Sequence, residues 1–380
     1  MDFAWTAAQK KIWEETAAFA AGLTHDVAAG DRDGVFPRTQ WMQCAAFGIQ
    51  GLGLPPEYGG RALDPESAAY AMEAFGYGCT DNGLVLALNA QMWTTQRSIL
   101  DFGTLAQKAH WLPALASGER IAAYAITEAE AGSDAYALEM RAERVPGGYR
   151  LNGRKTFVTL APIADVALVF ARTEPAGGMW GISAFLVERE RPGYRVGEPM
   201  GKMGLRTVPM SDLVLEDCVV PMDNRLGAEG QGAVISGSSL EWERSCMLAS
   251  LLGTIERLIE GAVTHARTRR QFGQPIGRFQ SVSNRVADLK MGLEAGRLLV
   301  YRVAWLKKHG KSAAMESALA KLQVTELFMA ASLDAVLVQG ARGYMSENEI
   351  ERHVRDAVGS LIYGGTSDIQ RSTIARLLGL

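Results

Sequence analysis

A block of short β-rich runs lies between two long stretches of helical pattern in this chain of 380 residues. From Tyr124 to about Pro221, strand-like segments alternate with turn residues. On either side of the block, apolar residues recur at the helical period. This order predicts a mainly α, α+β fold: a helical N-terminal domain (1–121), a middle antiparallel β-barrel or sandwich (122–226), and a C-terminal four-helix-type bundle (227–380).

Local patterns refine this prediction. Asn152-Gly153 lies between two β-rich runs and predicts a hairpin, because both residues tolerate positive φ. Further strands are expected at 165–172, 182–188 and 211–215. After the block, one apolar face runs from Met247 to Val263, so Glu241–Arg244 is expected at the start of a long helix.

Composition excludes several classes of protein. A net charge of -3 and 21% charged residues give no electrostatic reason to expect nucleic acid or an anionic membrane as partner. No signal peptide and no run of about 18 apolar residues occurs, so we expect a cytoplasmic protein without a membrane span. The four cysteines lack zinc-ligand spacing, which predicts reduced thiols and no metal site.

Five stretches carry residues suited to chemistry, although each alone is also compatible with caps, core packing or solvated helix turns. The glycines among them allow close approach of backbone to a ligand, and the arginines suit a pyrophosphate. In chain order the stretches are Tyr124–Asp134, Phe157–Thr159, Glu241–Arg244, Arg267–Ile276 and Ile362–Gln370.

The order and spacing of these stretches resemble the acyl-CoA dehydrogenase family over about residues 5–380. The likeness is carried by ITEAEAGSD, NGRKTFVT, KMGLRTVPMSDLVLEDCVVP, RTRRQFGQPIGRFQ and GGTSDIQRSTIARLL, with Ala129-Glu130 replacing the family's usual Pro-Gly. The resemblance implies the cofactor FAD. It also implies a homotetramer or homodimer whose subunits share cofactor contacts.

The resemblance assigns cofactor-binding roles residue by residue. It places Ile126, Thr127 and Ser133 near the flavin and its phosphates, and Phe157 and Thr159 beside the flavin ring. It implies that the FAD of a neighbouring subunit is contacted by Arg269, Gln271 and Phe272. It places Thr366 and Asp368 near the FAD phosphate and adenine.

The catalytic base departs from the commonest family pattern. Many members carry the basic Glu directly before Gly-Thr, where this chain has Gly364. A minority place it in a Glu-Arg pair on the first bundle helix, here Glu243-Arg244. We therefore predict Glu243 as the base that removes the α-proton of an acyl thioester, Arg244 as an orienting residue, and the Gly364 N–H as a donor to the thioester oxygen.

A second departure lies at Leu337–Ala341, where Leu337 replaces a Gln that helps to bind a neighbouring FAD. Some cofactor contacts are therefore expected to be absent.

The stretches Gly78–Asp81, Ala161–Asp165 and Ser239–Arg244 resemble a subgroup that oxidises acyl or prolyl groups on carrier proteins. A carrier-protein thioester is thus favoured over a CoA thioester, with electron-transfer flavoprotein or oxygen as the reoxidant. The alternatives are an acyl-CoA dehydrogenase of fatty or branched-chain acid oxidation, a flavin monooxygenase of the same fold, and a non-catalytic flavin-binding relative.

Overall fold

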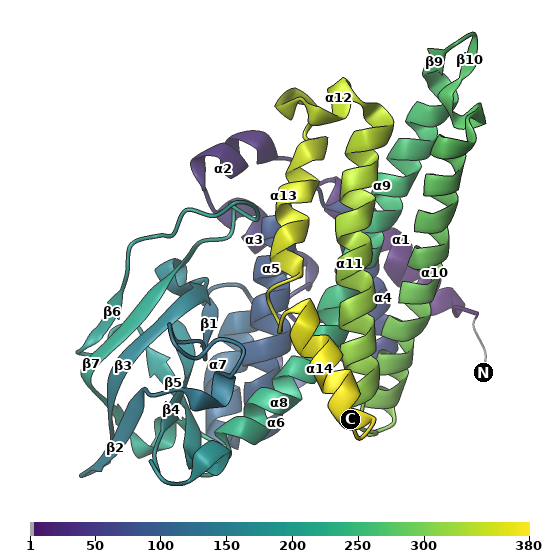
Figure 1. Cartoon of the computed structure of the whole chain (residues 1–380). Coiled ribbons are helices and arrows are strands. Elements are labelled where there is room, and N and C mark those ends of the chain that lie inside the picture. The colour runs from purple at the N-terminus through teal and green to yellow at the C-terminus, as the bar shows by residue number, and fades with distance from the viewer. Residues whose placement is uncertain (1–3) are drawn as a thin grey trace.

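The computed structural model describes residues 4–380. Figure 1 shows a curved sheet at one side of a body of helices that come from both ends of the chain. Side-chain caps begin several N-terminal helices, with capping boxes at Thr6 and Thr104. The elements are α1 Ala7–Ala21, α2 Val27–Asp33, α3 Arg38–Phe47, α4 Pro65–Gly78, α5 Asn82–Ala90, a π-helical segment η2 Gln91–Gln96, α6 Arg97–Phe102 and α7 Leu105–Ala116.

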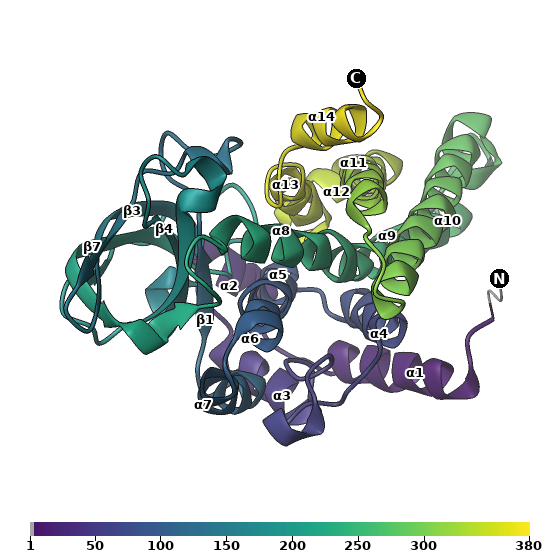
Figure 2. The same cartoon turned by 90° about the horizontal axis from the view of Figure 1, so that it is seen from below.

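The middle part is an eight-stranded sheet that curls into a barrel-like outline (Figure 2). Its strand order is β6-β7-β3-β2-β4-β5-β8, and most pairs are antiparallel. Two pairings, β1 with β4 and β2 with β4, are parallel. The strands are β1 Ala122–Ala125, β2 Arg141–Val145, β3 Gly148–Thr159, β4 Val166–Arg172, β5 Ile182–Glu188, β6 Tyr194–Val196, β7 Met210–Pro221 and β8 Arg225–Leu226.

The hairpin predicted at Asn152-Gly153 is wrong. Both residues lie inside β3, where the pairing with β7 shifts register between Leu151 and Gly153. Gly153 has φ 149°, and an added Cβ would lie 2.9 Å from atoms of Met140, so glycine serves close strand packing here. The actual turn precedes β3, between Val145 and Gly148.

The C-terminal part is a helical bundle. Its first helix is continuous through a π-helical segment: α8 Gly232–Trp242, η7 Glu243–Met247 and α9 Leu248–Thr268. The Glu-Arg pair therefore lies within this helical run and not at its start. The remaining elements are β9 Arg270–Gln271, β10 Gln274–Pro275, α10 Gln280–Lys308, α11 Ala314–Gln339, α12 Ala341–Tyr344, α13 Ile350–Ser360 and α14 Ser367–Leu377.

Helix α11 is long and apolar enough to cross a membrane by length and composition alone. It packs, however, against α9, α10, α13 and α14, which is the environment of a bundle core. The predicted order of helical, β and helical parts is confirmed.

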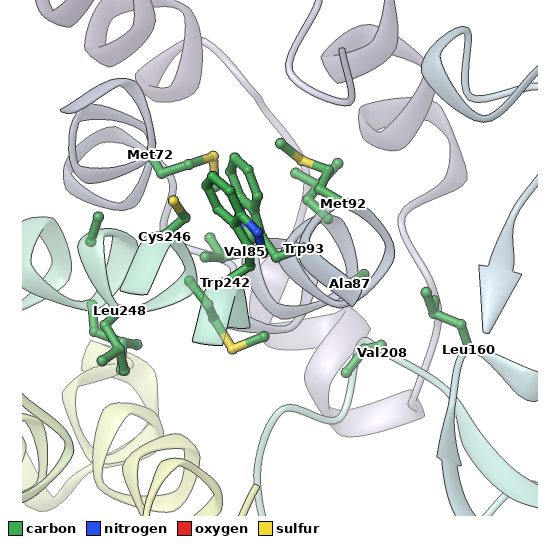
Figure 3. Close-up of a cluster of buried hydrophobic side chains, with 14 of the residues drawn as sticks. Met72, Val85, Ala87, Met92, Trp93, Leu160, Val208, Trp242, Cys246 and Leu248 are labelled. Carbon is green, nitrogen blue, oxygen red and sulfur yellow. The ribbon is translucent and has the colours of Figure 1, made fainter. Parts of the chain in front are cut away.

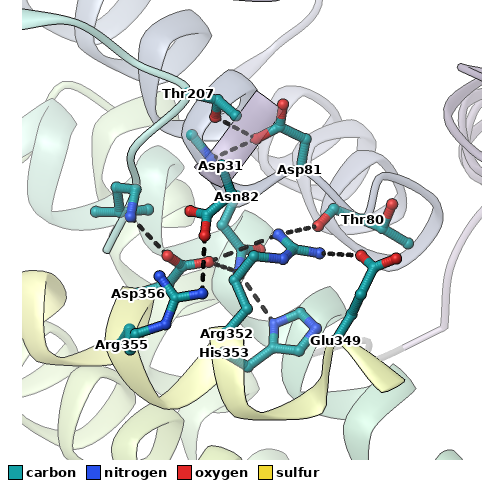
Figure 4. Close-up of polar contacts among 12 residues, drawn as sticks. Asp31, Thr80, Asp81, Asn82, Thr207, Glu349, Arg352, His353, Arg355 and Asp356 are labelled. Carbon is teal, nitrogen blue, oxygen red and sulfur yellow. Dashed lines mark hydrogen bonds and ion pairs between the residues drawn. The ribbon is translucent and has the colours of Figure 1, made fainter. Parts of the chain in front are cut away.

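A buried polar network joins the three parts around α13 (Figure 4). The Asn82 amide at the start of α5 donates to the Asp356 carboxylate at 2.8 Å and contacts the His353 ring at 3.0 Å. The second Asp356 oxygen accepts from the main-chain N–H of Leu205, before β7, at 2.6 Å. These contacts fix α13, which leads directly into the glycine turn of the candidate site.

Candidate active site

Glu243 and Gly364 lie against each other although 121 positions separate them in the chain. A Cβ atom built on Gly364 would lie 3.1 Å from Oε1 of Glu243. Glu243 begins the π-helical segment η7, a type of insertion that is frequent at functional sites because it reorients side chains within a helix. The structure thus brings together the two residues that the sequence suggested as complementary.

The turn Tyr363–Thr366 joins α13 to α14 and depends on its two glycines. Gly364 and Gly365 have φ of 64° and 94°, in the left-handed region that side chains disfavour. Arg244 donates from Nε to the Gly364 oxygen at 2.8 Å, and Gln370 donates to the same oxygen at 3.1 Å. Within residues 4–380 the Gly364 N–H makes no hydrogen bond, so it is available to a ligand.

The electrostatic surroundings of Glu243 suit a base that waits for substrate. Its carboxylate is partly buried and makes no hydrogen bond or ion pair with any residue that the structure describes. Burial raises the pKa of Glu243, whereas the charges of Arg244 and Lys321 act to lower it. Burial and the charge of Glu243 together raise the pKa of the Tyr363 hydroxyl.

The predicted flavin loop and the predicted ring-facing strand meet at the end of β1. The Thr156 N–H donates to the Thr127 oxygen at 2.9 Å. Lys155, which is fully buried, donates to the Ile126 oxygen at 3.0 Å and pairs with Glu128 at 2.7 Å. This buried ion pair fixes the backbone of the loop.

Phe157 departs from regular strand geometry. The β3–β7 ladder shifts between Lys155 and Val158, and Phe157 there has φ 54° and a side chain that is 61% exposed. The backbone at Phe157 is strained, and its ring points outward. Such an exposed ring is suited to pack against a flat ligand. Thr159 is half-buried farther along β3, and Ser133 is exposed in its loop.

The flavin loop is linked to the helix of Glu243. Tyr124 lies on β1, two residues before Ile126, and its hydroxyl lies 3.1 Å from Oγ of Ser239 on α8. Ser239 lies one helical turn before Glu243. Glu243 and the predicted flavin loop therefore lie on elements that contact each other directly.

A groove of about 410 Å³ lies at the start of α14. Thr366 caps this helix by accepting from the Ile369 N–H at 3.3 Å, and Asp368 lies in its first turn. Nearby Oγ of Ser367 and Oε1 of Gln370 are buried without a partner in the described part of the chain. The groove is lined by Glu326, Met329, Leu361, Ile362, Thr366, Ser367 and Asp368.

These features fit FAD. The outward Phe157 ring suits a flat aromatic group, and the unpartnered hydroxyl at a helix start suits a phosphate. Residues near the ring would be Ile126, Thr127, Phe157 and Thr159, and residues of the groove would be Thr366 and Asp368.

Three predicted cofactor residues lie apart from all others. Arg269, Gln271 and Phe272 lie on or beside the hairpin β9–β10, at the far end of the bundle from the turn between α13 and α14 (Figure 1). All three are exposed, and Phe272 is 93% exposed with φ 49°. Leu337, which is 52% exposed, lies near the end of α11, where Val338 packs in a small cluster with Ile276 after the hairpin.

Sequence reasoning missed Lys155 with Glu128, Gln370 and Lys321. Lys321 had a visible signal, because it and Glu326 are the charged residues between Ser317 and Ser332 on an otherwise apolar helix. The pairing of Lys155 with Glu128 had none, because nothing in the spacing of these residues shows that they meet.

Three family models match the chain in order. They are the N-terminal domain (residues 6–119), the middle domain (123–218) and the C-terminal domain (230–379) of acyl-CoA dehydrogenase.

Relatives match over the full length. The L-prolyl-[peptidyl-carrier protein] dehydrogenase of Pseudomonas fluorescens is 45% identical, with 100% of each chain covered. The crystal structure of the prolyl acyl carrier protein oxidase AnaB is 42% identical, covers 99% of this chain and 100% of its own, and has a TM-score of 0.98. PigA with FAD and proline is 38% identical, with 100% of each chain covered and a TM-score of 0.97. The chain therefore belongs to the acyl-CoA dehydrogenase family and is a flavin-dependent oxidoreductase that uses FAD.

Proposed function

We propose that this enzyme oxidises the α,β-bond of a prolyl or similar compact acyl group held as a thioester on a carrier protein. The observation that carries the reaction is the contact of Glu243 with Gly364, which sets a carboxylate beside an unused N–H. The carrier-bound substrate is supported by the full-length likeness to two L-prolyl-[peptidyl-carrier protein] dehydrogenases.

The residues divide the chemistry between them. Glu243 removes the α-proton, and the Gly364 N–H donates to the thioester oxygen as negative charge develops there. Arg244 orients the turn through the Gly364 oxygen. FAD, when bound, supplies the acceptor for the β-hydrogen as hydride. We propose that it is held by Ile126, Thr127, Ser133, Phe157, Thr159, Thr366 and Asp368, with Arg269, Gln271 and Phe272 contributed by a second subunit.

A pair of tryptophans supports a compact acyl group. Trp242 directly precedes Glu243 and stacks on Trp93 with ring centroids 6.1 Å apart and planes 10° apart (Figure 3). Arg97 lies over the Trp242 ring at 4.1 Å. The cavity that remains beside Trp93 has a volume of about 10 Å³, which is the scale of one water molecule. A long acyl chain would find the space beside these two tryptophans filled.

An oligomer is supported by exposed apolar side chains on the bundle. Large apolar patches on a protein surface mark interaction sites. On α10, α11 and α14 the exposed large apolar residues are Met291, Leu298, Trp305, Leu333, Leu337 and Leu377. We propose that α10, α11, α14 and the β9–β10 hairpin meet other copies of the chain, in a homotetramer or homodimer.

Anaerobic bleaching of the flavin tests the proposed substrate. The purified enzyme is mixed with prolyl-carrier protein, prolyl-CoA and butyryl-CoA, and visible flavin absorption is followed. Bleaching by prolyl-carrier protein at a rate well above that of prolyl-CoA is the expected result. Bleaching by the CoA esters alone would contradict the carrier assignment and favour ordinary acyl-CoA oxidation.

The absence of bleaching by every thioester, with FAD bound, would favour the monooxygenase or non-catalytic alternatives. After bleaching, adding either oxygen or electron-transfer flavoprotein to separate samples identifies the reoxidant, because the competent one restores the flavin colour fastest.

A further inference from the structure

Lys321 is a buried cation that the proposed chemistry does not use. It lies on α11 with 1% of its surface exposed. Its ammonium donates to the main-chain oxygen of Ser360 at 3.0 Å, and it has no direct ion pair within residues 4–380. Burial of an ammonium without a carboxylate partner is costly, so its position calls for a compensating role.

The contact with Ser360 ties Lys321 to the catalytic turn. Ser360 is the last residue of α13, where the free carbonyls of a helix end carry partial negative charge. Four residues later the chain reaches Gly364. An ammonium at this carbonyl therefore anchors the start of the turn that holds the Gly364 N–H.

The charge of Lys321 also acts on Glu243. Helix α11 packs against η7, the segment that begins with Glu243. Burial raises the pKa of Glu243, and the positive charges of Arg244 and Lys321 oppose that rise. Burial lowers the pKa of Lys321 to about 8, so its ammonium stays mostly charged at neutral pH.

Other groups near Glu243 do not replace this charge. Tyr124 and Tyr363 face it as neutral hydroxyls, because burial raises the pKa of both, and the charge of Glu326 acts on Lys321 from the same helix. Three charged side chains on nearby helices are paired elsewhere: Arg97 on α6 with Asp101, and on α10 Lys307 with Glu241 and Arg297 with Glu73.

We propose that Lys321 is a positioning residue that, together with Arg244, favours the ionised form of Glu243 before substrate binds and that holds the turn presenting Gly364. This inference rests on the proposed role of Glu243. In the step concerned, the α-carbon–hydrogen bond breaks, the proton passes to the Glu243 carboxylate, and the electron pair moves to the thioester enolate. One negative charge thus moves from Glu243 to the substrate while the Lys321 charge stays fixed at the Ser360 oxygen.

The test compares variants that separate the positive charge of Lys321 from its hydrogen bond to the Ser360 oxygen. Lys321→Met removes both, whereas Lys321→Gln removes the charge but retains an N–H donor for Ser360. Thr325→Val is the matched control, because Thr325 is buried one turn farther along α11 and bonds the Lys321 oxygen at 2.8 Å. One readout is deuterium uptake at the α-carbon of the thioester in D₂O as a function of pH. The other is the infrared titration of the Glu243 carboxylate, obtained by subtracting the Glu243→Gln spectrum.

Both Lys321 variants are expected to shift the acid limb of exchange and the infrared midpoint upward by about one pH unit, because a nearby cation is lost. Thr325→Val is expected to shift neither. An unmoved midpoint in Lys321→Gln overturns the charge role, and this variant alone decides the point if Lys321→Met does not fold. If instead Glu243→Gln exchanges at the wild-type rate, the base assignment fails and not merely the role of Lys321.

Discussion

The side chains of positions 243 and 364 compete for the same small space. A side chain on Gly364 would contact Oε1 of Glu243 from its first carbon onward, so only one of the two positions can carry a large group without rearrangement. The glycine also adopts a φ of 64° that suits it better than any other residue. At this scale, the proposed function depends on which of these two positions carries the carboxylate.

Replacing the base tests that division directly. We expect Glu243→Gln to bind FAD normally and to slow anaerobic bleaching by the best thioester about 10²- to 10⁴-fold, because the amide cannot accept the α-proton. Stopped-flow absorbance gives the rate, and the visible spectrum gives the FAD content. Bleaching of the Glu243→Gln variant at the wild-type rate would show that another residue is the base.

Adding one methyl group to the turn tests its geometry. We expect Gly364→Ala to slow bleaching by about 10- to 100-fold, because the new Cβ displaces the Glu243 carboxylate from a reacting geometry. Gly237→Ala on α8 is the matched control, since an added Cβ there meets nothing within 4 Å. Equal bleaching rates for Gly364→Ala and Gly237→Ala would show that the close packing at Gly364 does not affect catalysis.

At the scale of the elements, periodic patterns predicted well and local exceptions did not. The strand at Ile182–Glu188 and the long helices of the bundle followed from alternation and helical period. The Asn152-Gly153 pair failed because a turn dipeptide also suits a bulge, and the packing of Met140 against Gly153 decided between them. The π-helical segment at Glu243 could not be predicted from residue types, because no local sequence pattern marks it.

The candidate site was predictable where motifs mark it and hidden where distant segments meet. Glu243 and Gly364 came from the likeness to a family pattern, and the structure adds that a Cβ at position 364 would lie against the Glu243 carboxylate. The contact of Lys321 with Ser360 needs the packing of α11 on α13, which no local pattern encodes.

Helix α13 carries a pH-sensitive contact. His353 is buried and its Nδ1 faces the Asn82 amide, and burial lowers the pKa of His353 well below its usual range. A group whose folded pKa is lowered in this way costs stability once the unfolded form takes up a proton. The folded state should therefore lose stability as the pH falls below about 6.5.

We expect the free energy of unfolding to fall more steeply with acid in wild type than in His353→Gln, by up to about 1.4 kcal/mol per pH unit. Asp356, whose pKa burial raises to about 6, acts in the opposite direction but is present in both proteins. Urea unfolding at several pH values between 5 and 7 measures the difference. Parallel curves would show that His353 is protonated in the folded state.

At the scale of the whole molecule, the predicted cofactor residues fall into two distant groups. One gathers around the flavin loop and the α13–α14 turn, and the other lies on the exposed β9–β10 hairpin. One chain cannot bring both groups to one FAD without unfolding the bundle. The arrangement makes sense if each hairpin completes the site of another copy.

The hairpin tip is open to test by a single substitution. Burying a phenylalanine contributes about 1.5–3 kcal/mol, so Phe272→Ser is expected to weaken subunit association by at least about 10-fold and to lower FAD retention. Light scattering measures the first and absorbance after gel filtration the second. Leu105→Ser, an exposed position on α7, is the control. Wild-type mass and FAD content in Phe272→Ser would place the hairpin outside the interface.

The contact between Glu243 and Gly364 also limits how such an enzyme changes over evolutionary time. A lineage that moves its base between the two positions must substitute both, and neither order is harmless. Gaining the second carboxylate first crowds two like charges into one space, and losing the first carboxylate first leaves no base. We therefore expect an impaired intermediate between enzymes with the Glu at position 243 and enzymes with it at position 364. Each branch of the family should then keep the position that it has.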